Sequence, residues 1–309
     1  MAESYANRLA SFKGKHDFFI GIDSDGCAFD TMEIKHKECF IPNIIKHLGL
    51  QAVSKYAREA AEFVNLYSRW RGINRFPALE MTLDLLEERR EVRERHVTVP
   101  RLAAMRDWIA VEPKPSNPAL ETAIRAADDG AGPELKRVLD WSQAVNAAIA
   151  DMVRGVPPFP WVRESLEEAF VRADIIVVSA TPTAALEQEW AEHDIARYAA
   201  LIAGQEMGKK AEHLQRTTQG RYARSNVLMI GDAPGDFEAA RANGALFYPI
   251  NPGAESESWE QFAHEALDRF FAGRYAGDYE ASLIARFEAL LPDTPPWKCW
   301  NPQSAHSKD

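Results

Sequence analysis

The chain has 309 residues, of which 46% are hydrophobic and 27% charged, and its 36 basic and 46 acidic side chains give a net charge of −10. This composition is typical of a folded globular protein of one or two domains and excludes a disordered chain. The acidic balance argues against general nucleic-acid binding, which needs a basic surface. A local cluster of cations could still bind an anionic small molecule.

Sequence features that report on location point to a soluble protein. No apolar run approaches the roughly 18 residues of a membrane span, and the polar start MAESYANRLASFKGKHD lacks the apolar segment of a signal peptide. The cysteines Cys27, Cys39 and Cys299 are odd in number and lack the spacing of metal ligands. We therefore expect free thiols, a cytoplasmic location and no membrane partner.

Short apolar runs rich in β-branched residues predict the strands of a buried parallel sheet. They cover residues 18–22, 174–178, 198–203, 227–230 and 245–250. Helical patterns at residues 183–193, 209–216 and 237–242 alternate with the later runs. Such alternation predicts right-handed βαβ units, and hence an α/β fold class with a doubly wound parallel sheet.

The segment after the first strand has a different character. Helical patterns such as YAREAAEFVNLYSRW fill it, with almost no strand signal, and the proline-rich VPPFP follows at residues 156–160. We predict an α-helical domain at 32–154, inserted into an α/β domain formed by 1–31 and 155–309. The chain from about residue 251 is predicted to be a helical extension of the α/β domain. Its end, PDTPPWKCWNPQSAHSKD, lacks a core-building pattern and is predicted to be partly disordered.

Polar side chains follow four of the predicted strands. They are Asp23 and Asp25, Ser179, Lys209 and Lys210, and Asp232 and Asp236. The carboxyl ends of parallel strands meet at one edge of a sheet, which is where open α/β folds bind their ligands. Polar turns are the alternative for the aspartates, and a helix cap is the alternative for the serine.

In this order the four motifs resemble those of the haloacid dehalogenase (HAD) superfamily of phosphohydrolases. They are DxDG at residues 23–26, a serine after the second strand, a lysine near a helix start, and GDxxxD at residues 231–236. The resemblance covers roughly residues 17–31 and 161–250. It implies a HAD-like Rossmannoid core, and it also implies a helical cap inserted after the first motif.

The resemblance further implies a Mg²⁺-dependent phosphatase that acts on a small phosphorylated metabolite. The implied catalytic residues are Asp23, Asp25, Ser179 and Lys210, and the implied metal site comprises Asp23, Asp25 through its backbone carbonyl, Asp232 and Asp236. Hard divalent cations prefer such oxygen ligands. Ionised Asp23 would attack phosphorus to form an aspartyl-phosphate, and Asp25 would give and take the proton. Asp236 would orient the lysine or a metal-bound water.

Several alternatives stay open at this point. Either Lys209 or Lys210 could reach the phosphate, and the spacing to the next aliphatic residue favours Lys210. A phosphomutase would use the same motifs, and a phosphonate hydrolase would need a Schiff-base lysine such as Lys35 or Lys37. A catalytically inactive binding protein is the other class. Within the family, the second acid, Asp25, argues against carbon–halogen chemistry.

The predicted cap contains a group of basic and aromatic residues around RWRGINRFPAL. His36 and the arginines Arg69, Arg71 and Arg75 could face a substrate or could serve only the packing of helices, and the sequence does not decide between these roles. Cys27 replaces the residue usual after DxDG and is predicted to pack in the core, because a thiol without a placed histidine does not support cysteine catalysis.

Overall fold

The computed structural model describes residues 5–299. The chain divides into two compact units. Of the described residues, unit 1 comprises 5–34 and Val153–Leu290, and unit 2 comprises Lys35–Met152 together with 291–299. No helix within the described range has the length and apolarity needed to cross a bilayer.

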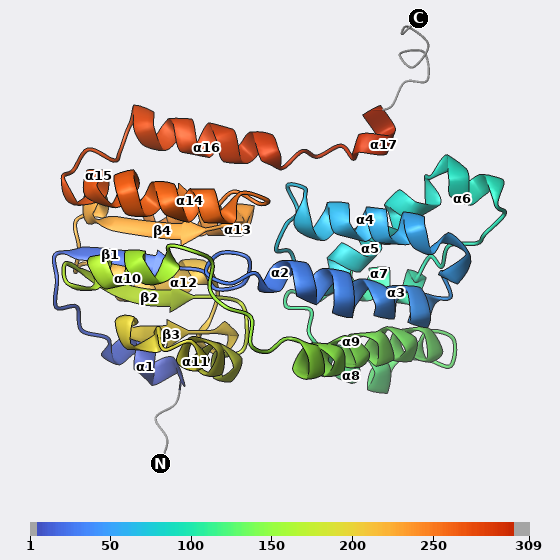
Figure 1. The fold of residues 1–309 in the computed structure, drawn as a ribbon. Helices are drawn as coiled ribbons and strands as arrows, with labels where there is room; N and C mark the ends of the chain where they lie inside the picture. Colours follow the sequence, from blue (N-terminus) through green and yellow to red (C-terminus); the bar gives the residue numbers. More distant parts are fainter. Residues whose placement is uncertain (1–4, 300–309) are drawn as a thin grey trace, which may run out of the picture. The chain divides into compact units, whose positions relative to one another are not determined.

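Unit 1 is built on one parallel sheet with the strand order β3-β2-β1-β4-β5 (Figure 1). The strands are β1 (Phe18–Ile22), β2 (Ala173–Val178), β3 (Leu201–Ala203), β4 (Val227–Gly231) and β5 (Leu246–Pro249). In the central strand β1, Ile20 pairs with Ile175 of β2 and with Leu228 of β4. The predicted α/β fold class with a doubly wound parallel sheet is confirmed. Because the strand order reverses at β1, the loops after β1 and β4 lie beside each other.

The third strand is shorter than predicted. The apolar run at residues 198–203 predicts six strand residues, but Ala196–Tyr198 form a 3₁₀ turn and only Leu201–Ala203 pair with β2. Tyr198 is buried, and its backbone N–H donates to the carbonyl of Ile195. A buried turn contains apolar residues just as a strand does. The apolar run therefore led to a predicted strand that begins too early in the chain.

Helices cover both faces of the sheet (Figure 1). On one face lie α10 (Val162–Phe170), α11 (Thr183–Glu192), α14 (Glu255–Gln261) and α15 (Leu267–Phe271), which share the main apolar core with alternate residues of the strands. On the other lie α1 (Tyr5–Ser11), α12 (Lys210–Thr218) and α13 (Pro234–Asn243). The long helix α16 (Asp278–Leu290) packs against β5, where the ring centroids of Phe247 and Phe287 are 5.8 Å apart.

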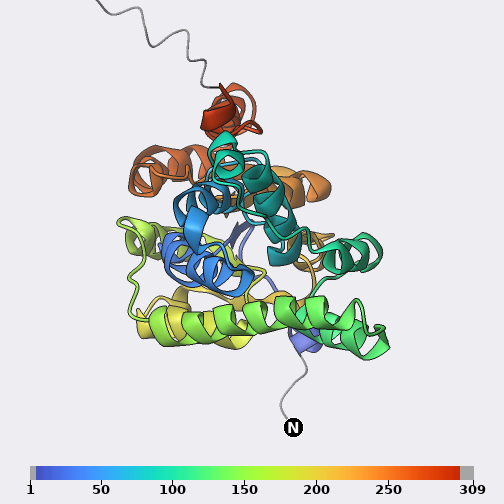
Figure 2. The same cartoon turned by 90° about the vertical axis from the view of Figure 1, so that its right-hand side faces the viewer.

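Unit 2 is helical. A π-helical turn (Lys35–Phe40) follows the short α2 (Thr31–Ile34) of unit 1 and leads into the helices of unit 2. These helices are α3 (Ile41–Leu48), α4 (Ser54–Leu66), α5 (Arg75–Glu87), α6 (Arg90–Glu94), α7 (Ala103–Val111), α8 (Asn117–Ala126) and α9 (Gly132–Met152). Helix α9 is the long green helix of Figure 2, and it packs against α3, α7 and α8. One apolar cluster that contains Phe76 and Trp141 forms the core of this unit.

The end of the described chain packs with unit 2. The ring of Trp297, in α17 (Pro296–Cys299), lies 5.7 Å from the ring of Phe63, and the guanidinium of Arg89 stacks over Trp297 at 4.4 Å. The prediction assigned the whole range 155–309 to the α/β domain, and the structure differs here because an aromatic side chain close to the C-terminus packs on α4. Residues 300–309, at the end of the tail predicted to be disordered, lie outside the described residues.

Candidate active site at the carboxyl ends of the strands

Asp23 directly follows β1 and is 5% exposed. Its backbone N–H donates to the carbonyl of Ile230 in β4 at 3.0 Å, so the residue continues the sheet for one more step. One carboxylate oxygen, Oδ1, accepts from the backbone N–H of Ser24 at 2.8 Å. The other, Oδ2, accepts from Nζ of Lys210 at 2.5 Å. The carboxylate is thus held in one orientation by a donor on each oxygen.

Asp25 is held by two hydroxyl groups. Thr31 Oγ1 donates to its Oδ1 at 2.5 Å, and Thr181 Oγ1 donates to its Oδ2 at 2.7 Å. The donors come from the start of α2 and from the loop after β2, so the tertiary fold brings them to one carboxylate. Neither threonine was predicted from the sequence. Thr181 lies two residues after Ser179, and its position past a strand end was the signal that could have identified it.

The two candidate lysines differ in their surroundings. Lys210 begins α12, and its Nζ contacts Asp23 and also Asp236 Oδ1, at 2.7 Å. Lys209 precedes the helix, and its backbone N–H donates to the Glu212 side chain. Burial alone would lower the pKa of Lys210, but the charges of Asp23 and Asp236 raise it above its ordinary value. The structure therefore brings Lys210, and not Lys209, into the group of acids.

The loop after β4 supplies the other acids. Asp232 is 1% exposed and Asp236 is fully buried in the first turn of α13, where its Oδ2 accepts from the backbone N–H of Ala233 at 3.1 Å. Gly231 is required at the strand end, because a Cβ there would meet Cβ of Asp236 at 2.3 Å. The pKa of Asp236 is raised to about 7, with burial as the largest cause. The charges of Asp23 and Asp232 also raise it, and Lys210 opposes the rise.

Three of these carboxylates form one cluster. Oxygen atoms of Asp23, Asp232 and Asp236 lie within 4.8 Å of one another, and all three residues are buried. When ionised they carry three negative charges against the single positive charge of Lys210. Crowded buried carboxylates are unfavourable unless a cation joins them, and a hard divalent cation such as Mg²⁺ fits a set made only of oxygens. The expected backbone ligand, the carbonyl of Asp25, stays a prediction.

Ser179 directly follows β2 and is 2% exposed. Its backbone N–H donates to the carbonyl of Ala203 at 3.0 Å, and its Oγ accepts from the backbone N–H of Thr181 at 3.2 Å. It does not cap α11, whose N-cap residue is Pro182 and whose first residue, Thr183, donates to Glu206 instead. The hydroxyl hydrogen of Ser179 is therefore not used by the helix start.

Cys27 lies beneath the site as a packing residue. Its side chain is fully buried, and its Sγ donates to the carbonyl of Ile230 at 3.7 Å. Burial raises the pKa of this thiol well above its ordinary value, and the charges of Asp232 and Asp23 raise it further. A thiol of this kind is a poor nucleophile at neutral pH, which agrees with a role in packing.

The candidate residues of unit 2 have local partners. Arg71 is 3% exposed and its guanidinium donates to the carbonyl of Leu66, while Arg69 lies 3.6 Å from a carboxylate oxygen of Asp293. Arg75 donates to Ser142 and Asn146 and stacks over Phe40. Burial lowers the pKa of Arg75 to about 10. Arg69 and Arg71 thus have structural contacts, and a substrate-facing role for any of the three stays a prediction.

Comparisons with known proteins find similarity in structure alone. No protein-family model matches the chain, and no curated protein matches it. A HAD-superfamily hydrolase of subfamily IA from Geobacter sulfurreducens is 16% identical, covering 77% of this chain and 89% of its own, with a TM-score of 0.39. A putative β-phosphoglucomutase from Bacteroides vulgatus is 15% identical, covering 88% of this chain and 97% of its own, with a TM-score of 0.47.

A third solved structure is described as a putative phosphoglycolate phosphatase from Lactobacillus delbrueckii subsp. bulgaricus. It is 14% identical, with coverage of 81% of this chain and 92% of its own, and its TM-score is 0.43. At such identities and scores, a similar arrangement of elements does not fix an activity, because one fold supports many functions.

Proposed function

We propose that this protein is a Mg²⁺-dependent phosphohydrolase that acts on a small phosphorylated metabolite through an aspartyl-phosphate on Asp23. The observation that carries this proposal is the state of the Asp23 carboxylate. It is buried, it has a donor on each oxygen, and it lies in one cluster with Asp232 and Asp236. A fixed carboxylate beside a cation site is the arrangement that nucleophilic attack on a phosphoryl group needs.

The residues present fit a divalent cation. Asp23, Asp232 and Asp236 offer oxygens within 4.8 Å of one another, and Lys210 balances only one of their charges. Mg²⁺ bound by these acids would neutralise phosphoryl oxygens and lower the barrier to attack by an anion. A cation would also lower the raised pKa of Asp236, because it favours the ionised form of a neighbouring carboxylate.

The first step is attack by Asp23. An oxygen of its carboxylate forms a bond to phosphorus while the bond from phosphorus to the ester oxygen breaks. Asp25 gives a proton to the departing oxygen, so the product alcohol leaves neutral. Thr31 and Thr181 fix the direction of the Asp25 carboxylate, which keeps it aimed at one place during proton transfer.

The second step is hydrolysis of the aspartyl-phosphate. Asp25, now ionised, takes a proton from water, the water oxygen bonds to phosphorus, and the bond to Asp23 breaks to release inorganic phosphate. Lys210 contacts Asp23 and carries a positive charge, so it would neutralise charge on the transferring group. Ser179 would donate its hydroxyl hydrogen to a phosphoryl oxygen.

The test is turnover of p-nitrophenyl phosphate by the purified protein, with Mg²⁺ and with a chelator, together with thermal unfolding under the same two conditions. We expect turnover only with Mg²⁺, and a higher melting temperature when Mg²⁺ is present. The absence of both effects would favour a binding protein without catalysis.

Two related activities are separated by the choice of substrate. A phosphomutase would return the phosphoryl group to a sugar phosphate and release little inorganic phosphate. A phosphonate hydrolase would need a lysine that forms a Schiff base, whereas Nζ of Lys37 donates to the hydroxyl of Tyr67 at 2.9 Å. A screen of phosphorylated metabolites for phosphate release, followed by product identification, would name the substrate class.

A further inference from the structure

A second group of charged residues lies at the opposite end of the strands from the acid cluster. The loop at residues 13–17 precedes β1, whereas Asp23 follows it, and a strand of five residues spans about 16 Å. This loop is fixed by Asp174 at the start of β2, which is 4% exposed. The Asp174 carboxylate accepts from the backbone N–H groups of Lys15 and His16 and from the hydroxyl of Tyr222.

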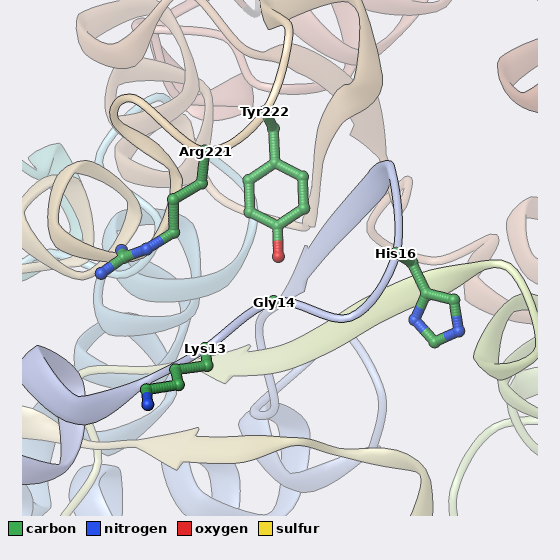
Figure 3. A pocket seen from close by; sticks show the side chains of 5 residues that line it. All are labelled: Lys13, Gly14, His16, Arg221 and Tyr222. Atoms are coloured by element: carbon green, nitrogen blue, oxygen red, sulfur yellow. The ribbon is translucent and has the colours of Figure 1, made fainter.

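The fixed loop borders a cavity of about 310 Å³. The cavity is lined by Lys13, Gly14, His16, Arg221 and Tyr222 (Figure 3). In Figure 3 the side chains of Lys13 and Arg221 extend to the same side, the ring of Tyr222 stands over Gly14, and His16 lies at the other end. Position 14, beneath the Tyr222 ring, requires glycine, because a Cβ there would lie 2.1 Å from the Tyr222 hydroxyl oxygen.

A second hollow of about 320 Å³ adjoins the first, because His16 lines both. Its other lining residues are Lys15, Asp17, Phe18 and Arg172. The imidazole Nδ1 of His16 lies 3.3 Å from Oδ1 of Asp174. When Nδ1 carries the hydrogen of this contact, Nε2 of the neutral ring is an acceptor that a donor group of a ligand can meet.

The cations around these hollows lack acidic partners. Within residues 5–299, no carboxylate forms an ion pair with Lys13, Lys15, Arg172 or Arg221. Arg221 donates to the carbonyls of Arg216 and Thr217, and Arg172 stacks over Phe271. Asp174 is already engaged by donors of the loop, which leaves Asp17 as the one acid that lines the second hollow. In a chain with a net charge of −10, such a concentration of unpaired cations is unexpected.

We propose that the first cavity binds a small phosphomonoester, with its phosphate group at Lys13 and Arg221 and the rest of the molecule extending past Tyr222 toward His16. A lysine ammonium and an arginine guanidinium offer the charge and the donors that a phosphate dianion accepts, and the imidazole Nε2 can accept from a hydroxyl group of the ligand. The volume is at the lower end of the range for small-molecule sites, which suits a phosphomonoester better than a nucleic acid. The site is separate from the acid cluster and does not depend on the proposed catalysis.

Binding is tested by NMR, which follows the chemical shifts of the His16 imidazole in metal-free protein at constant pH and ionic strength. The probes are inorganic phosphate and glycerol 2-phosphate, with sodium chloride as the ionic-strength control, and the variant His16→Gln assigns the resonance. We expect saturable shifts with both probes but not with chloride, and the same shifts in an Asp23→Asn background. A stronger response to the ester than to inorganic phosphate would identify a phosphorylated metabolite as the ligand class.

The charge requirement is tested with Lys13→Ala combined with Arg221→Ala, and with Lys13→Ala alone in case the loss of the Arg221 contacts disturbs folding. Both side chains belong to exposed residues. We expect the affinity read at His16 to fall at least tenfold in the double variant and to stay unchanged in Arg274→Ala, a matched exposed arginine of unit 1. Absence of saturable shifts in the parent protein, or equal affinity in parent and double variant, would overturn the proposal.

Discussion

Buried aspartates occupy both ends of the sheet, and their surroundings differ. At the amino end, Asp174 is a single carboxylate surrounded by donors from Lys15, His16 and Tyr222. At the carboxyl end, Asp23, Asp232 and Asp236 crowd within 4.8 Å with Lys210 as the cation that contacts them. The first arrangement is complete within the protein. The second brings three carboxylates close together, and their mutual repulsion costs stability unless cations offset it.

This difference separates a structural aspartate from catalytic candidates that are equally buried. A buried carboxylate that accepts several hydrogen bonds stabilises the loop that donates them. Burial raises the pKa of Asp236, and the charges of Asp23 and Asp232 add to that rise. Perturbed groups of this kind concentrate at functional sites. Substitutions at the two ends of the sheet should therefore affect different properties.

The largest effect is expected for Asp23→Asn. An amide oxygen cannot replace an ionised carboxylate as the nucleophile, so turnover of p-nitrophenyl phosphate should fall below detection and no phosphoenzyme should form. Steady-state assays and intact-mass spectrometry after rapid quenching measure both quantities. The control is Asp268→Asn, an exposed aspartate of α15, which should keep parental turnover. A phosphorylated Asp23→Asn protein would remove Asp23 as the nucleophile.

The next largest effect is expected for Asp25→Asn, because the proposed role of this residue is proton transfer. General acid–base assistance contributes ~10²–10⁴-fold, and an alkyl phosphate should lose most of it. An aryl phosphate needs little protonation of its leaving group, so its first step should survive better and the phosphoenzyme should last longer. Rapid-quench kinetics with both esters provide the measurement. Equal losses on the two esters would contradict the acid–base assignment.

At the amino end, Asp174→Asn should change stability and not chemistry. The amide group turns one acceptor into a donor that faces the donors of the loop, so the free energy of unfolding should fall by about 2–4 kcal/mol. Urea denaturation followed by circular dichroism measures this loss, and turnover per folded molecule should be retained. Asp17→Asn, an exposed neighbour, serves as the control and should change stability little. A stability loss no larger than in this control would show that the hydrogen bonds of Asp174 are not structural.

The smallest effect, and the one that contrasts the two ends most directly, is expected for Asp232→Asn. A neutral amide is a weaker ligand for a hard cation, so the Mg²⁺ affinity should weaken by about tenfold or more. Without metal, the same change removes one of the crowded charges, so the free energy of unfolding should stay the same or rise. Calorimetric titration with Mg²⁺ measures the affinity, and urea denaturation of chelator-treated protein measures the free energy of unfolding. Parental Mg²⁺ affinity in this variant would place Asp232 outside the metal site.

Local patterns in the sequence were sufficient for the sheet and for the motif positions. Apolar runs bounded by turns are set by residues within a few positions of one another, so the amino-acid sequence was enough to locate β1, β2, β4 and β5. Asp23 and Asp232 could be placed at one edge of the sheet because parallel strands end there. The exception was the third strand, since local hydrophobicity does not distinguish a buried turn at Tyr198 from a strand.

Contacts between distant segments decided the rest. Lys209 and Lys210 are adjacent in the sequence, and only the start of α12 relative to β1 determines which one meets Asp23. The hydroxyl of Thr181 reaches Asp25 across 156 positions of the chain. No periodicity encodes such a contact, because it depends on how strands and helices pack.

The same limit applies to Asp174 and to Trp297. The sequence predicted only that Asp174 begins a strand. In the folded protein, hydrogen-bond donors from two other segments surround its carboxylate. The packing of Trp297 beside Phe63 likewise follows from the path of the folded chain after α16. The sequence by itself determined the sheet and the residue types at its carboxyl edge, because both depend on short-range order. Only the tertiary structure decided which buried aspartates lie among hydrogen-bond donors and which lie among other carboxylates, because these surroundings depend on every group that folding brings near.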